Sequence, residues 1–268
     1  MKKVIVLLFI VVLFTSCEEV VEIDLNASEP RLVVDASINL FVDGTSNSRV
    51  KLTLTAPFFN NLIPEVDDAS VVITADNGMV YSFNYTEGGI YKSSLVPVSG
   101  MNYTLEINYK GETYSATEQL NAVSSLEFVE QNNDGGFSGE DIVLKAFFTD
   151  PLGIGNHYFF EGTSERGVVL DTFFDEFFDG NPIFGFYRVD DLEAGDEVIF
   201  NLYGVNEQFY NFMFVLLQQG SDRGGGPFET QPATVRGNMI NETNIDNFPL
   251  GYFRMSEVST LTYTVQEL

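Results

Sequence analysis

The sequence has 268 residues, of which 44% are hydrophobic and 14% aromatic, including 25 Phe, 12 Tyr and no Trp. This apolar content is enough for a large folded core, which excludes a disordered acidic tail. The chain carries 13 basic against 39 acidic residues, a net charge of −26, and such a charge excludes a nucleic-acid-binding protein.

The chain begins with the pattern of a secretory leader. Lys2 and Lys3 precede an apolar run of eleven residues from Val4 to Phe14, and the small residues Thr15 and Ser16 follow. A charged start, a short apolar run and small residues before a cleavage point predict a signal peptide over residues 1–16. The alternative is a transmembrane helix, but the run is shorter than the roughly 20 residues that span a bilayer.

Leu13 to Cys17 resembles the bacterial lipobox, in which the cysteine is acylated and becomes the mature N-terminus. Cys17 is the only cysteine, and acylation removes the liability of an unpaired thiol in an oxidising compartment. Two or three acyl chains give an anchor that one chain cannot. A free cysteine beside an ordinary cleavage site is the alternative. Loss of the leader removes Lys2 and Lys3 and leaves a net charge of −28.

Glu18 and Glu19 follow the cysteine directly. This arrangement resembles the acidic tract that sends some Bacteroidota lipoproteins to the outer face of the outer membrane. The alternative is an ordinary solvated linker. We expect residues 17–29 to be an acylated tether and the protein to be exposed on the cell surface.

Residues 30–122 have the pattern of an Ig-like β-sandwich. Apolar and polar residues alternate with a period of two, as in half-buried strands. Turn signals such as Asp43-Gly44, Asp76-Asn77-Gly78 and Lys110-Gly111 separate the runs. About seven short strands are expected in this region. The clearest runs are 31–38, 50–55, 70–75, 79–84, 103–109 and 112–118.

Residues 123–268 form the second predicted domain, which is also β-rich and mostly antiparallel. Residues 131–136 read as a loop, and Phe209, Phe212, Met213 and Leu216 recur at three- to four-residue spacing, which predicts one helix over 206–219. The sequence therefore predicts an all-β fold of two domains with one helix. Strands are expected at 142–148, 157–161, 168–174, 183–189, 198–203, 250–253 and 261–265.

Several short motifs together resemble the lipoprotein family known only as domain of unknown function DUF4249. They span nearly the whole mature chain and comprise Glu22-Ile23-Asp24-Leu25, residues 30–34, residues 54–59, residues 69–74, Gly89-Ile90-Tyr91, residues 194–198, Phe209-Tyr210, Gly237-Asn238 and Gly251-Tyr252-Phe253. The resemblance implies an outer-membrane lipoprotein of Bacteroidota, often encoded near TonB-dependent transporters. It implies no catalytic residue.

The residue types available argue against an enzyme. His157 is the only histidine and no free thiol remains, so zinc or copper sites built from nitrogen and sulfur are not expected. A Ser-His-Asp triad would need His157, which we expect to be structural, and the nucleophile elbow Gly-x-Ser-x-Gly is absent. No cofactor is expected, although calcium is a candidate because it takes oxygen ligands. The candidate ligands are Asp134, Glu140 and Asp141 in one loop and Asp175 and Asp179 in another, with ordinary turn chemistry as the alternative.

Two aromatic segments are candidate contact surfaces for a partner or ligand. Phe58 and Phe59 lie in an apolar loop, and Phe173, Phe174, Phe177 and Phe178 alternate with acidic residues between 171 and 179. Exposed apolar patches often mark binding surfaces. The alternative is that these rings fold back into the core of their own domain.

We therefore expect a non-enzymatic accessory or ligand-binding subunit that works with a TonB-dependent transporter. The alternative is a free-standing surface module that binds glycan or protein. A carbohydrate-active enzyme is a third hypothesis, because 39 acidic residues always offer carboxylate pairs.

Overall fold

The structure is a computed structural model that describes residues 29–56, 62–136, 139, 141–220 and 234–267. In these ranges the chain forms fifteen strands, the helix α2 (Glu207–Gly220) and the 3₁₀ helix η1 (Asp175–Phe177). None of the described helices has the length and apolar character that crossing a membrane requires.

Twelve strands form one hydrogen-bonded sheet, whose first seven strands we call the central segment and last five the outer segment. The order is β11 (Gly167–Phe174), β10 (His157–Ser164), β13 (Glu197–Val205), β15 (Leu250–Thr264), β1 (Leu32–Phe41), β2 (Ser46–Leu54) and β5 (Ile90–Ser93), followed by β4 (Val80–Tyr85), β3 (Ser70–Ala75), β6 (Asn102–Tyr109), β7 (Glu112–Gln119) and β14 (Ile240–Asn241). A second sheet has the order β12 (Pro182–Tyr187), β9 (Asp141–Thr149) and β8 (Leu126–Gly135).

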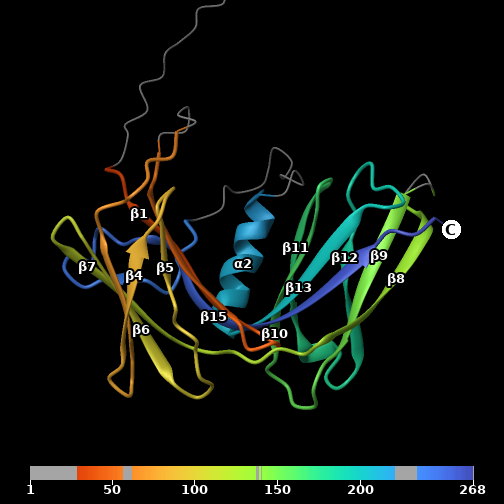
Figure 1. Cartoon of the computed structure of the whole chain (residues 1–268), viewed down its shortest axis with the longest axis horizontal. Helices are drawn as coiled ribbons and strands as arrows, with labels where there is room; N and C mark the ends of the chain where they lie inside the picture. Colours follow the sequence, from red (N-terminus) through yellow and green to blue (C-terminus); the bar gives the residue numbers. More distant parts are fainter. Residues whose placement is uncertain (1–28, 57–61, 137–138, 140, 221–233, 268) are drawn as a thin grey trace, which may run out of the picture.

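These sheets make two sandwiches that share the central segment (Figure 1). At β4 the twelve-stranded sheet turns back on itself, because β4 pairs with β5 only through Asn84 and Tyr85. The outer segment thereby covers β1, β2 and β5, and the first core lies between them. The three-stranded sheet covers β10, β11 and β13 in the same way and encloses the second core.

Strand β15 joins the two sandwiches. Its first part runs parallel to β1, from Leu250 opposite Val33 to Val258 opposite Phe41. Its second part pairs antiparallel with β13, from Val258 opposite Tyr203 onward. One strand of fifteen residues is therefore a structural member of both sandwiches.

Helix α2 packs on the face of the central segment that points away from the first and second cores. Successive side chains of a strand point to opposite faces, so one strand serves two cores. In β10, Tyr158 and Phe160 enter the second core, whereas Phe159 between them packs against Phe209 of α2 in a third core. Figure 1 shows α2 lying between the two sandwiches, on the concave side of the bent central segment. All three cores are built from residues after Arg31.

The predicted all-β fold with an Ig-like first sandwich and one helix is confirmed, and α2 begins one residue later than expected. Three details differ. Residues 131–135 are not a loop but the end of β8, because their backbone pairs with β9 around a bulge between Asn132 and Gly135. The predicted strands 250–253 and 261–265 are one strand, β15.

The third difference concerns the boundary at residues 122–123. It does not divide the two sandwiches cleanly, because β15 pairs with β1, and Met239, Phe253 and Met255 belong to the first core. The chain passes into the second sandwich at β8 and returns to the first near its end. Neither sandwich is complete without the C-terminal strand.

Candidate functional site

Several residues predicted from the sequence lie outside the described ranges. They are Cys17, Glu18, Glu19, Phe58, Phe59 and Glu140. The lipid anchor, the export signal and the first aromatic loop therefore remain sequence predictions.

The four phenylalanines of the 171–179 segment divide into two kinds. Phe173 and Phe178 pack against the second core, so for these two rings the fold-back alternative holds. Phe177 is 85% exposed. Phe174 lies between it and α2, with its ring centroid 6.3 Å from that of Phe177 and 5.4 Å from that of Tyr210.

Phe177, Phe174, Tyr210 and Phe214 form a continuous surface feature, which we call the aromatic row. The ring of Tyr210 stacks on that of Phe214 at 5.9 Å, and Phe214 is 45% exposed on the outer side of α2. His157 adjoins the row, 5.3 Å from the Tyr210 ring, and its Nδ1 lies 3.0 Å from the carbonyl oxygen of Gly155. Tyr210 and Phe214 were not predicted as site residues, because only the packing of α2 brings them beside β11.

Two of the predicted calcium ligands do come together. Carboxylate oxygens of Asp175, Asp179 and Asp150 lie within 4.8 Å of one another, and we call these residues the acidic triad. Asp150 was not predicted, since it follows β9 and is distant in sequence. Asp141 is instead paired with Arg188, with Oδ2 3.0 Å from Nε, and Asp134 is exposed on β8.

The acidic triad has a structural task in the loop before β10. Asp175 is 1% exposed and accepts hydrogen bonds from the backbone N–H groups of Gly155 and Asn156, at 2.8 and 2.9 Å. Burial alone would raise the pKa of Asp175, but these bonds hold it below its usual value. Burial raises the pKa of Asp150, whose Oδ1 accepts the Tyr158 hydroxyl. Three carboxylates at this spacing have the oxygen chemistry that hard cations prefer.

Polar and apolar side chains together line a groove between α2 and the concave face of the central segment. We call it the α2 groove, and its volume is about 550 Å³. Residues of β1, β2 and β15 form its floor, among them Asp35, Asn39, Arg49 and Arg254. The apolar wall consists of Phe159, Leu170, Phe209, Phe212, Met213 and Leu216.

The start of α2 is clamped in place beside this groove. Asn206 caps the helix, because its Oδ1 accepts the backbone N–H of Phe209 at 2.8 Å. Its Nδ2 donates to Glu118 at 2.8 Å, and the Tyr252 hydroxyl donates to Asn206 Oδ1 at 3.2 Å. Burial raises the pKa of Glu118, although donors from three side chains surround it. The helix is thus tied at one end to β7 and β15.

Two polar atoms at the floor of the groove have no hydrogen-bond partner among the described residues. They are Oδ1 of Asn39, a residue 9% exposed, and Nη1 of Arg254. The guanidinium of Arg254 lies over the ring of Tyr203 at 4.4 Å, and burial lowers its pKa. Buried polar atoms are nearly always hydrogen-bonded, so a donor and an acceptor left open in one groove indicate a place for a missing partner.

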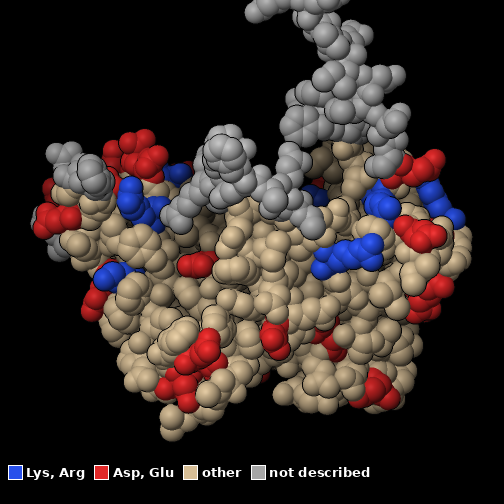
Figure 2. All heavy atoms as spheres, turned by 180° about the vertical axis from the view of Figure 1, so that it is seen from behind, with Lys and Arg blue, Asp and Glu red and all other residues tan. Residues whose placement is uncertain are grey.

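The formal charges around the groove balance. Arg49 donates to Asp35 at 2.9 Å, Glu161 accepts the Tyr203 hydroxyl at 2.7 Å, and Asp35 and Glu161 both favour the charged form of Arg254. This neutrality contrasts with the rest of the surface. On the face seen in Figure 2, acidic side chains occupy the lower part of both lobes and also lie near the upper edge, where basic side chains stand among them.

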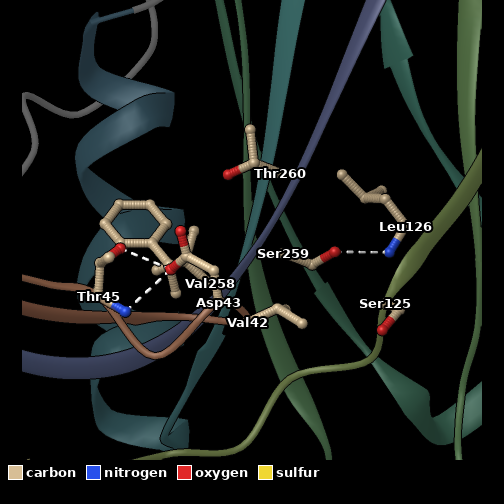
Figure 3. A pocket seen from close by; sticks show the side chains of 9 residues that line it. Val42, Asp43, Thr45, Ser125, Leu126, Val258, Ser259 and Thr260 are labelled. Carbon is tan, nitrogen blue, oxygen red and sulfur yellow. Dashed lines mark hydrogen bonds between the residues drawn. The ribbon is translucent and has the colours of Figure 1, made fainter.

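A second hollow, of about 600 Å³, lies where the β1–β2 turn meets β15 (Figure 3). Several of its polar groups are already paired with one another. Thr45 donates its backbone N–H and its hydroxyl to Asp43, at 2.9 and 2.6 Å, and the N–H of Leu126 donates to the Ser259 hydroxyl at 2.8 Å. It therefore offers less specific recognition than the α2 groove.

A family model described as Domain of unknown function (DUF4249) matches residues 18–262 of this chain. No curated protein matches it. Among solved structures, a two-domain fibronectin type-III segment from chicken tenascin aligns with 13% identity and a TM-score of 0.21, over 67% of this chain and 92% of that one. A 1.5-MDa bacterial ice-binding adhesin aligns with 10% identity and a TM-score of 0.24, over 89% and 66%. At these scores neither alignment bears on function.

Proposed function

The chain belongs to the DUF4249 family of domains of unknown function, and from this premise we propose that it is a non-enzymatic binding lipoprotein of the Bacteroidota outer membrane. It is acylated at Cys17, faces the cell exterior and serves as an accessory subunit of a TonB-dependent transporter. Its ligand site is the α2 groove.

The α2 groove is the observation that carries this proposal. Ligand sites are concave and mostly apolar, with a few polar groups that fix orientation. The groove has this composition, and at its floor one atom each of Asn39 and Arg254 has no hydrogen-bond partner in the described part of the chain and can bind a ligand. The two carboxylates that line it are already engaged, Asp35 by Arg49 and Glu161 by the Tyr203 hydroxyl, so binding suits its chemistry better than acid–base catalysis.

The tether supports placement of the body beside a membrane partner. Residues 17–29 separate the acylated cysteine from the described part of the chain, and an extended segment of this length spans at most about 45 Å. The folded body can therefore reach the outward loops of a neighbouring membrane protein while its acyl chains stay in the bilayer.

The aromatic row supports contact with a protein partner. Successive rings of the row make T-shaped, tilted and stacked pairs, and Phe177 and Phe214 expose large apolar area to water. Aromatic side chains are enriched at protein interfaces because they bury much surface at little entropic cost.

The test is affinity purification of the tagged, acylated protein from native outer membrane in mild detergent, followed by mass spectrometry. We expect one TonB-dependent transporter in near-equal amount. The double variant Phe177→Ser, Phe214→Ser should lose the transporter, whereas Val42→Ser, which changes a residue 76% exposed outside the row, should retain it. Cys17→Ser should move the protein out of the membrane fraction.

Recovery of the lipoprotein alone from the membrane would overturn the transporter association. The α2 groove would then favour the second candidate, a free-standing surface module that binds its ligand without a membrane partner. That candidate predicts equal ligand binding by acylated and non-acylated chains, with no protein co-purifying with either.

A further inference from the structure

We infer that the α2 groove binds an uncharged amphiphile, with a hydroxyl or carboxamide head between Asn39 and Arg254 and an apolar body along α2. This inference rests on the proposed role of the groove as a ligand site. It goes further by assigning the chemical class of the ligand and the residues that select it.

The two open atoms require a group that accepts and donates at once. Nη1 of Arg254 is a donor, and Oδ1 of Asn39 is an acceptor. Arg254 is opposite Ser37 in the parallel β1–β15 pair, so Asn39 lies two residues farther along on the same face of the neighbouring strand. A hydroxyl or a primary amide satisfies both atoms. A carboxylate leaves Asn39 facing another acceptor, and an ammonium cannot accept from Arg254.

The charge balance also selects against an ionised head. Two carboxylates, Asp35 and Glu161, and two guanidiniums, Arg49 and Arg254, line the groove, and Arg49 is paired with Asp35 at 2.9 Å. An anion would have to compete with these carboxylates, and a cation would be placed against the buried guanidinium of Arg254. A neutral head meets neither cost.

The helix side of the groove fits an apolar body. Leu170 and Leu216 are 38% and 41% exposed at its edge, and Phe209 and Phe212 lie deeper. Met213 between them has a flexible, polarisable side chain that adapts to ligands of varied shape. An apolar chain laid here removes both its own surface and that of α2 from water.

The test uses a chain that begins at Glu18, which contains all three cores. Four ligands share the same ten-carbon tail and differ only in the head group. Decanol, decanamide, decanoate and decylammonium are each titrated as competitors of the neutral fluorescent probe N-phenyl-1-naphthylamine at pH 7, and displacement of the probe is measured. We expect decanol and decanamide to bind at least tenfold more tightly than either ion. Equal binding of all four, or tightest binding of an ion, would overturn the inference.

Substitutions then assign the selectivity. Asn39→Leu and Arg254→Met keep shape but remove the open atoms, so each should abolish the preference for neutral heads while the probe still binds. Met213→Asp should weaken all four ligands and the probe together. The control Val42→Ser should change nothing. If Asn39→Leu and Arg254→Met fold, bind the probe and keep the preference, the assignment is wrong.

These outcomes are separable from those of the proposed function. Transporter capture is measured with the acylated chain and needs no added ligand. Transporter capture without binding of any ten-carbon ligand would overturn this inference alone.

Discussion

Replacing Asn39 by Leu should make the protein more stable, which is unusual for a change at a buried polar residue. Asn39 is 9% exposed on β1, and its Oδ1 has no hydrogen-bond partner among the described residues. In the unfolded chain this oxygen is hydrated, so folding removes a hydrogen bond to water and returns none. Leu has nearly the same shape and carries no polar atom.

The magnitude follows from two opposing terms. A buried unsatisfied polar group costs about 1–3 kcal/mol, which Leu removes. Methyl groups against neighbouring strands can add crowding, which offsets part of this gain. We therefore expect the free energy of unfolding to rise by about 1–2 kcal/mol. For a domain of this size each kcal/mol shifts the melting temperature by about 2–4 °C, so Tm should rise by roughly 2–8 °C.

The assay is urea denaturation and calorimetry of the chain that begins at Glu18, with Asn241→Leu as the matched control. Asn241 is 5% exposed but fully engaged. Its Nδ2 donates to Glu112 and to the Asn247 carbonyl, and its Oδ1 accepts two backbone N–H groups. The same substitution there should destabilise by about 2–4 kcal/mol, because each group it leaves unpaired carries a penalty.

Equal destabilisation at both sites would refute the reasoning. It would mean that Asn39 has a stabilising partner in solution, such as a tightly held water that bridges it to Arg254. The expected pattern instead separates stability from function, because Asn39→Leu gains stability and loses ligand selectivity.

Three further outcomes follow from the described contacts. Gly251→Ala should lower the free energy of unfolding, measured by urea denaturation, by more than about 3 kcal/mol, because a Cβ would lie 1.9 Å from the Val34 carbonyl oxygen. The control Gly100→Ala has a similar positive φ but open space around the Cβ, so it should lower that free energy by only about 1–2 kcal/mol. The raised pKa of Glu118 gives stability that is present below its unfolded pKa and lost as pH rises through its folded pKa. The difference in unfolding free energy between wild type and Glu118→Gln should therefore shrink from pH 4 to pH 7. The pH dependence at Asp175 is opposite, because its lowered pKa gives stability that is lost as pH falls. Asp175→Asn should therefore lower the free energy of unfolding by about 2–3 kcal/mol at pH 7 and by less below about pH 4. A loss of stability that is independent of pH would contradict this.

The strand pattern was readable in the sequence wherever one face is buried and the other is not. Residues 50–54 alternate as expected, with Val50 and Leu52 buried in the first core. β5 was missed because it has only four residues. The end of β8 was missed because its Asn, Asp and Gly residues have turn chemistry, and only pairing with β9 holds them extended.

Two of the three residues of the acidic triad were predicted from the sequence. Asp175 and Asp179 are near in sequence and share a turn, so local spacing was enough to group them. Asp150 joins them through the packing of the loop after β9, which no local pattern reports. The aromatic row was also predicted in part, since its rings at Phe174 and Phe177 were predicted and those on α2 were not.

By itself the sequence determined the leader pattern, the all-β class, the place of the one helix and membership of a family. These are local or compositional properties, set by periodicity, turn residues and short motifs. Only the tertiary structure decided that β15 serves both sandwiches and that a groove exists beneath α2. The groove combines residues of β1, β2, β10, β11, β13, β15 and α2, and an unpaired atom is recognisable only once every potential neighbour has been placed.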